Sequence, residues 1–168
     1  MEMQSNKVIG IIGTPKSVDR YIATNFLNTN IDYFIIDMNK KMEETQNVLQ
    51  CMRIWSEQYA QQKFNEDDLI TFLYIAGLDE RIDTQIAKLA IGEKKRLLFL
   101  KAMLANCYYY IIHGLFDGVD KKDIETLTQM VIELSTYATI ILTAENDNGF
   151  SICDKIFILC KYSLVIFD

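Results

Sequence analysis

The segment GTPKSVDR, residues 13–20, contains the residue types that could bind a phosphate group. It follows a short apolar run, KVIGIIG, as a phosphate-binding loop follows a buried strand. Such a loop has the pattern G-x-x-x-x-G-K-[ST], in which backbone N–H groups and the lysine contact phosphate and the hydroxyl binds Mg²⁺. With Gly13 as the first glycine, three positions are changed: the second glycine, the lysine and the hydroxyl residue become Val18, Asp19 and Arg20.

Asp19 changes the electrostatics of this segment because it puts a negative charge where the pattern has a positive one. At ~4 Å and an effective dielectric constant of ~20, this turns an attraction of about 4 kcal/mol into a repulsion of similar size. Val18 also brings a Cβ atom to a point where the backbone must pass close to phosphate. This alignment predicts a loop that does not bind a nucleotide.

A second alignment treats Lys16 and Ser17 as the lysine and hydroxyl residue of a shortened loop. In that alignment Pro15 removes one N–H donor from the phosphate site. We prefer the first alignment and keep the second as an alternative, in which the turn around Lys16 and Ser17 still binds ATP and Mg²⁺.

A second segment, LAIGEKKRLLFLKAMLANCYYYIIHGLFDGVD at residues 89–120, resembles the signature motif, Walker B strand and D-loop of ATP-binding-cassette (ABC) ATPases. In that family the signature motif is LSGGQ-x-x-R. Three residues keep its outline: Leu89, Gly92 and Arg96. Three others replace its serine, first glycine and glutamine: Ala90, Ile91 and Glu93. The segment therefore resembles an eroded signature motif.

The Walker B and D-loop motif of the family, an apolar strand followed by D-E-P-T-x-G-L-D, corresponds here to HGLFDGVD. His113 stands where the family has its magnesium-binding aspartate, and Gly114 where it has its catalytic glutamate. The closing segment TIILTAENDNGFSICDKIFIL resembles the family's last two core strands, and the switch histidine's position falls at about Ala144. The resemblance thus implies a pseudo-ATPase that needs no ATP or Mg²⁺.

The order of these parts implies an α/β fold of the P-loop NTPase type, with a mainly parallel sheet and helices on both faces. The sequence predicts strands at 7–13, 32–37, 108–112, 139–143, 155–160 and 163–167. It predicts helices at 18–27, around 48–62, at 66–76 with Asn65 as N-cap, at 92–106 and after the cap Asp120. We expect one ABC ATPase-like domain, 1–168, with a core lobe at 1–39 and 89–168 and a helical insertion at 40–88. Fewer residues separate Gly13 from Leu89 than in the family. We therefore expect the family's small antiparallel subdomain to be trimmed in this chain.

Composition excludes several classes of protein. The chain has 168 residues, half of them hydrophobic, which suits one packed domain. Its net charge of −6, from 17 basic and 23 acidic residues, argues against a nucleic-acid surface. The basic residues 94–96 and Lys101 are expected on a solvated helix face. The sequence has no signal pattern and no apolar stretch of about 18 residues, so membrane association would need a partner.

Several residues have both a functional and a structural interpretation. The four cysteines lack metal-site spacing and are expected to be buried thiols. His113 could be a general base, but it has no evident nucleophile beside it in the sequence. Trp55 and Tyr59 could dock a partner or close the insertion's own core. Asp117 and Asp120 are expected to be turn and cap residues.

Three functions remain open from the sequence. The first is a catalytically inactive structural or regulatory subunit of a transport complex, in the cytoplasm at the inner face of the membrane. Its partners would be a transporter membrane subunit, an active ABC ATPase subunit or a second copy of the chain. The second is a weak ATPase whose site a partner completes. The third is a regulator unconnected with transport.

Overall fold

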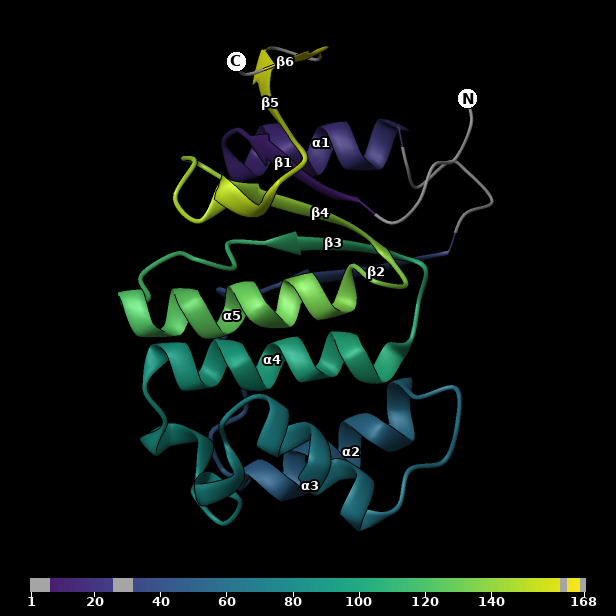
Figure 1. The fold of residues 1–168 in the computed structure, drawn as a ribbon, viewed down its shortest axis with the longest axis vertical. Coiled ribbons are helices and arrows are strands. Elements are labelled where there is room, and N and C mark those ends of the chain that lie inside the picture. Colours follow the sequence, from purple (N-terminus) through teal and green to yellow (C-terminus); the bar gives the residue numbers. More distant parts are fainter. Residues whose placement is uncertain (1–6, 26–31, 161–162, 167–168) are drawn as a thin grey trace. The chain divides into compact units, whose positions relative to one another are not determined.

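The structure, a computed structural model, describes residues 7–25, 32–160 and 163–166 and shows strands alternating with helices (Figure 1). The strands are β1 (Val8–Ile12), β2 (Tyr33–Asp37), β3 (Tyr109–His113), β4 (Thr139–Ala144), β5 (Lys155–Cys160) and β6 (Ser163–Ile166). The α-helices are α1 (Pro15–Asn25), α2 (Val48–Tyr59), α3 (Glu66–Ile75), α4 (Ile91–Ala105) and α5 (Lys121–Leu134). Short 3-10 helices lie at Asp79–Arg81, Ile86–Lys88 and Phe150–Ile152.

The described strands form one sheet in the order β2-β3-β4-β1-β5-β6. Its first five strands are parallel, and β6 runs antiparallel beside β5. The predicted mainly parallel α/β sheet is therefore confirmed. Parallel strands end at a common edge, so Asp37, His113 and Thr143 lie in register near the carboxyl ends of β2, β3 and β4. Ligands bind at this edge in open α/β sheets.

Helix α1 packs on the sheet through one apolar stripe and lies beside β1 in Figure 1. Val18 and Ile22 are four residues apart, so they project from the same side of the helix. Both are buried, in a cluster with Ile11, Ile111, Ile141 and Leu159. Burying an aliphatic side chain contributes about 1.5 to 3 kcal/mol, so this stripe fixes the rotation of α1 about its axis.

Helix α1 begins earlier than predicted, at Pro15 instead of Val18. Proline suits the first helical position because its fixed φ is helical and its missing N–H would have no partner there. The predicted last two residues of this helix, 26 and 27, lie outside the described residues, as does the predicted last residue of the final strand, 167.

Helices α2 and α3 begin with capping boxes. The Asn47 side chain accepts a hydrogen bond from the Gln50 N–H at 2.8 Å, and the Gln50 side chain accepts one from the Asn47 N–H at 3.0 Å. Asn65 and Asp68 exchange the same two bonds, both at 2.9 Å, which confirms the predicted N-cap. Helix α2 ends at Tyr59, a little before the predicted end, because Ala60 has extended backbone angles.

Helix α4 is buried along most of its length, which overturns the expected solvated basic face. Lys95 is only 3% exposed, and the Arg96 side chain is 13% exposed. A helix that packs on several sides leaves little of its surface in water, even where its residues are charged. It ends at Asn106, whose φ of 48° is the left-handed conformation common after a helix.

The chain forms two compact units. The first comprises Met1–Asn39, Cys107–Asp117 and Val131–Asp168 and contains α1 and all the described strands. The second comprises Lys40–Asn106 and Gly118–Met130 and contains α2, α3 and α4. Helix α5 begins in the second unit and ends in the first.

The four cysteines are free thiols. Cys51 is buried and Cys107 and Cys153 are half-buried, whereas Cys160 at the end of β5 is exposed, so the expectation of buried thiols fails there. Burial raises the pKa of Cys51 and of Cys153 to about 12, so both remain protonated near neutral pH.

Candidate functional site

The β1–α1 turn, residues 13 and 14, is the structural counterpart of the predicted phosphate loop. Only Gly13 and Thr14 lie between the end of β1 and Pro15, the first residue of α1. The Thr14 carbonyl accepts hydrogen bonds from the N–H groups of Ser17 and Val18, at 2.9 and 3.0 Å. Since Pro15 has no N–H, the start of α1 is largely satisfied by its own chain.

The two alignments of this segment fall on successive turns of α1. Lys16 and Ser17 lie in the first turn, where Lys16 is exposed and the Ser17 hydroxyl donates to the Thr14 carbonyl at 2.8 Å. Asp19 and Arg20 follow in the second turn, and both are exposed. Val18, at the position aligned with the second glycine, lies in the apolar cluster under the helix.

His113 ends β3 and lies between a buried hydroxyl and a carboxylate. Its Nδ1 forms a short hydrogen bond with Thr143 Oγ1 on β4, and its Nε2 lies 3.8 Å from Asp19 Oδ1. Burial lowers the pKa of His113. The negative charges of Asp19 and Asp37 act to raise this pKa, but the effect of burial is larger. The imidazole is therefore neutral near pH 7. Thr143 is buried, so it offers no accessible nucleophile for His113 to activate.

Gly114 adopts a φ of +64°, and no side chain fits at this position. A Cβ atom there would overlap the Asn39 amide and lie 2.6 Å from Asp117 Oδ2. The Asn39 Nδ2 donates to Asp117 Oδ2 at 2.9 Å, and the Gly114 N–H donates to the Thr143 carbonyl at 2.8 Å. The space around the position aligned with the catalytic glutamate is thus filled by an amide–carboxylate contact.

Asn39 was not singled out in the sequence, although it belongs to this site. It follows β2 by two residues, and its N–H donates to Asp37 Oδ1 at 2.9 Å. The signal that could have located it is the D-x-N spacing directly after an apolar strand, since such residues form turns at strand ends. Ala144, at the end of β4, contributes its carbonyl, which accepts from the Gly13 N–H at 2.9 Å.

The signature-like residues lie at the start of α4, in the second unit. Leu89 is buried just before the helix. A Cβ atom on Gly92 would overlap the Asp123 carboxylate, so this position requires glycine. Glu93 accepts from the Ala90 N–H at 2.9 Å and from Arg81 at 2.9 Å. Burial alone would raise the pKa of Glu93, but these two interactions outweigh it and lower the pKa.

Arg96 joins three parts of the second unit. Its Nε lies 3.2 Å from Asp123 Oδ1, and one terminal nitrogen donates to the carbonyls of Ala76 at 2.7 Å and Gly77 at 3.1 Å. The Arg96 guanidinium therefore holds the end of α3 and the start of α5 to α4. The predicted cap of α5 is confirmed, because Asp120 Oδ1 accepts from the Asp123 N–H at 2.9 Å.

Trp55 and Tyr59 on α2 have a partner within the second unit. Lys101 of α4 lies over both rings, with its Nζ 5.5 Å from the Trp55 ring centroid and 4.3 Å from that of Tyr59. Trp55 is half-buried, and Tyr59 remains 38% exposed. The pair thus contributes to packing between α2 and α4 while leaving part of one ring accessible.

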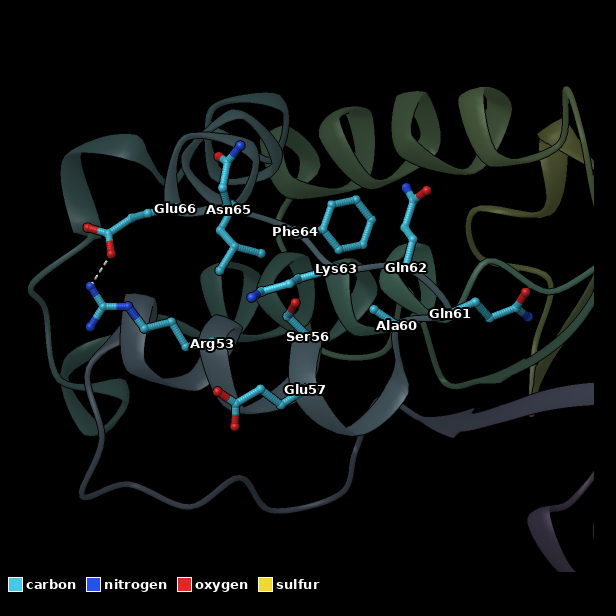
Figure 2. Close-up of a pocket in the computed structure, with 11 residues that line it drawn as sticks. Arg53, Ser56, Glu57, Ala60, Gln61, Gln62, Lys63, Phe64, Asn65 and Glu66 are labelled. Carbon is cyan, nitrogen blue, oxygen red and sulfur yellow. Dashed lines mark hydrogen bonds and ion pairs between the residues drawn. The ribbon is translucent and has the colours of Figure 1, made fainter.

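A groove of about 480 Å³ lies between the end of α2 and the start of α3 (Figure 2). Figure 2 shows Arg53 and Glu66 joined by an ion pair at one end of it, away from Gln61 and Gln62. Arg53 and Lys63 bring positive charge to its lining, while Glu57 and Glu66 bring negative charge. The groove therefore has no net preference for an anion or a cation, and it lies outside the sequence-predicted site.

Two kinds of feature are not found among the described residues. None of their helices has the length and apolar character needed to cross a membrane. Within the same residues, no three side chains of histidine, cysteine, aspartate or glutamate gather as ligands for a metal ion.

The arrangement of the sheet and helices is that of the ATP-binding cassettes of ABC transporters. The structure matches an inward-facing metal-chelate type ABC transporter with a TM-score of 0.78 and 13% identity, over 99% of this chain and 73% of that one. It matches cbiO1 from Clostridium perfringens, part of the ABC transporter complex cbiONQ, with a TM-score of 0.76 and 16% identity, over 98% and 78%. The predicted ABC ATPase-like fold is therefore confirmed.

Similarity in sequence also points to an ATP-binding protein. The chain is 26% identical over 125 residues to the cytochrome c biogenesis ATP-binding export protein CcmA of Reclinomonas americana. The match covers 74% of this chain and 55% of CcmA, so the chain spans about half the length of that protein. No family model matches the chain. The chain thus resembles ABC transporter ATP-binding subunits in fold and in part of its sequence.

Proposed function

We propose that this chain is a subunit of an ABC-type transport complex that supports its partners without hydrolysing ATP. The observation that carries the proposal is the length of the β1–α1 turn. Thr14 alone separates Gly13 from the first residue of α1, whereas the phosphate-binding pattern has four residues before its second glycine. A one-residue connection cannot wrap N–H groups around a phosphate, and Thr14 already binds the N–H groups of Ser17 and Val18.

The groups that would perform hydrolysis are replaced as well. Mg²⁺ prefers oxygen ligands. The position aligned with the magnesium-binding aspartate is instead His113, whose neutral imidazole is hydrogen-bonded to the Thr143 hydroxyl. Gly114 offers no carboxylate to orient water, and its surroundings leave no space for one. Ala144 has no side-chain donor for a γ-phosphate. These replacements support an inactive subunit more than a slow enzyme.

The partner in this proposal is a membrane subunit or an active ATPase subunit of a transporter, or a second copy of the chain. The likeness to cassettes taken from ABC transporters supports this assignment. In this proposal the chain is one cytoplasmic domain at the inner face of the membrane. Its core lobe is 1–39 and 89–168, and its helical insertion, 40–88, presents the accessible part of Tyr59 to a partner.

Phosphate release from ATP with Mg²⁺ tests the absence of hydrolysis. We expect the rate with the purified chain to equal the blank and not to change in Lys16→Ala. Turnover above the blank that Lys16→Ala removes would disprove the proposal. Co-purification from detergent-solubilised cells tests the partnership, since a regulator unconnected with transport would be recovered without any membrane subunit.

A second candidate function is a nucleotide-binding subunit whose site a partner completes. One observation favours it: Lys16 and Ser17 lie in the first turn of α1, the helix that follows β1, and the phosphate-binding pattern also has its lysine and hydroxyl residue after a strand and its loop. Lys16 is exposed there. Its weakness is that Ser17 donates to the Thr14 carbonyl, so its hydroxyl is engaged within the turn.

A further inference from the structure

The turn at residues 147–150, between β4 and the last 3-10 helix, contains the chain's single Asn-Gly pair, Asn148 and Gly149. The Phe150 N–H donates to the Asp147 carbonyl at 2.9 Å, and Gly149 has a φ of 79° and a ψ of 1°. Such angles belong to the third residue of a type II turn. The peptide group that joins Asn148 to Gly149 therefore lies in the middle of the turn.

This central peptide group is not held by the rest of the described chain. Among the described residues, neither the Gly149 N–H nor the Asn148 C=O has a hydrogen-bond partner. The Asn148 side chain is exposed, and its amide makes no hydrogen bond to them either. Asn146 differs, because its Oδ1 accepts from the Asn148 N–H at 3.0 Å. The Asn148–Gly149 peptide group can thus rotate without breaking a hydrogen bond within this part of the chain.

The fold requires glycine directly after Asn148. Gly149 has a positive φ, and a Cβ atom on it would lie 2.4 Å from the ring of Phe116, which is buried. A glycine nitrogen has no side chain beside it to shield it from a neighbouring group. The residue that fits this turn therefore also leaves an unhindered backbone nitrogen next to an exposed side-chain amide.

We propose that Asn148 is a site of spontaneous deamidation. The Gly149 nitrogen gives its proton to hydroxide and attacks Cγ of Asn148. The new N–Cγ bond closes a cyclic imide, the Cγ–Nδ2 bond breaks, and the amide nitrogen takes a proton from water and leaves as ammonia. Water then adds to one of the two imide carbonyls and breaks its C–N bond, which gives aspartate or isoaspartate at position 148. The sum consumes one water, releases one ammonia and needs no oxidant or reductant.

Both products change the turn. Each adds a negative charge beside Glu145 and Asp147. Isoaspartate also routes the backbone through the former side chain, which lengthens the turn and moves Gly149 relative to the Phe116 ring. Isoaspartate is the substrate of enzymes that methylate its carboxylate with S-adenosylmethionine, so the modified turn is a substrate for that class of enzyme. The reaction needs no nucleotide or partner and does not depend on the proposed transport function.

A second pair that could form an imide, Asp117 and Gly118, provides a contrast. Asp117 Oδ2 accepts from Asn39 Nδ2 at 2.9 Å, so this carboxylate is held in place. A carboxyl group must also be protonated before it can leave as water, whereas an amide can leave as ammonia near neutral pH. Isoaspartate formation at position 117 is therefore expected to be slower, and it would leave the mass of the chain unchanged.

Incubation of the purified full chain at mildly alkaline pH, followed by peptide mapping with mass spectrometry, tests the proposal. The unaltered chain and Asn146→Gln should both lose the side-chain amide at position 148 and become substrates for enzymatic isoaspartate methylation there. Asn148→Gln should show neither change, because its longer side chain closes a ring far more slowly. Methylation confined to position 117, or equal methylation of Asn148→Gln, would overturn the proposal.

The unaltered chain unfolded in urea gives the reference rate, because it contains the same Asn-Gly pair without the turn. We expect the folded chain to lose the amide within the period in which the unfolded chain loses it. A folded chain that keeps the amide at position 148 after the unfolded chain has lost it would show that the turn protects Asn148, and would refute this site.

Discussion

The β1–α1 turn and the start of α4 both align with motifs that contact nucleotide in ABC ATPases, but they differ from those motifs in different ways. At the turn the backbone that would surround a phosphate is missing, because Thr14 alone joins Gly13 to the helix. At α4 the helix, its glycine and its arginine are present. There the chain's own acids occupy the helix start, with Glu93 bonded to the first turn and Asp123 against Gly92.

This difference separates two ways in which a segment can depart from a phosphate-binding motif. A helix N-terminus attracts anions through its free N–H groups and its dipole. At α4 the Glu93 carboxylate accepts from the Ala90 N–H, and the Asp123 carboxylate lies against Gly92, so negative charge from the chain itself stands at the positive end of the helix. The β1–α1 turn is shorter than the phosphate-binding pattern, whereas the start of α4 keeps the glycine and arginine of the signature pattern and uses them in internal contacts.

The largest expected effect concerns Gly114 in the turn after β3, the position aligned with the family's catalytic glutamate. Gly114→Ala should lower the free energy of unfolding by about 3 kcal/mol, because it combines a left-handed φ with overlap against Asn39 and Asp117. Urea denaturation measures this. Gly118→Ala is the matched control, since Gly118 has a φ of +68° with nothing within 4 Å of its Cβ position. An equal cost in both variants would show that crowding at Gly114 is unimportant.

A smaller effect is expected at Gly92 of α4, where the same substitution should lower stability when Asp123 is present and raise it when Asp123 is removed. Gly92→Ala should destabilise the chain by about 2 kcal/mol, because the methyl group displaces the Asp123 carboxylate from Arg96. In an Asp123→Ala background the same change should stabilise it by up to about 1 kcal/mol, as alanine favours a helix over glycine. A double-mutant cycle in urea measures the coupling. If Gly92→Ala costs the same in both backgrounds, Asp123 does not determine the need for glycine.

The pH dependence of stability tests the interpretation of His113. Burial lowers its pKa from the usual 6.5, so the unfolded chain takes up a proton more readily than the folded one. The stabilisation from neutral His113 is complete above about pH 6.5 and is lost as pH falls from there through the folded pKa. His113→Gln should reduce this slope in pH-dependent urea denaturation. An unchanged slope would mean that folding does not shift the pKa of His113.

The smallest effect is expected at the contact between α4 and α2, where Lys101 lies over the rings of Trp55 and Tyr59. Lys101→Met should cost about 0.5 to 1 kcal/mol, because it removes the ammonium from the Trp55 and Tyr59 rings while keeping a similar apolar stem. Trp55 is the single tryptophan, so its fluorescence reports unfolding directly. Lys101→Arg serves as control and should retain most of the stability. A loss as large in Lys101→Arg would point to packing instead of charge.

The fold could be predicted from the sequence because strand runs, caps and motif order all agree. Asn65 and Asp120 were recognisable as caps, and both cap their helices. The β1–α1 turn was harder, because the pattern fixes residue spacing and not the first helical residue. The burial of Lys95 was not predicted, because the charges and spacing of the residues in α4 do not show how much of the helix surface other parts of the chain cover. Asn39 was missed because its contact with Asp117 joins residues far apart in the chain.

Calorimetric titration of the full chain with ATP and Mg²⁺, alongside an intact ABC ATPase as control, tests the central claim most directly. With the short turn between Gly13 and α1, we predict no saturable heat from the chain under conditions in which the control binds. Saturable one-to-one binding at micromolar concentration, lost in Lys16→Ala, would contradict the account and favour the partner-completed nucleotide site.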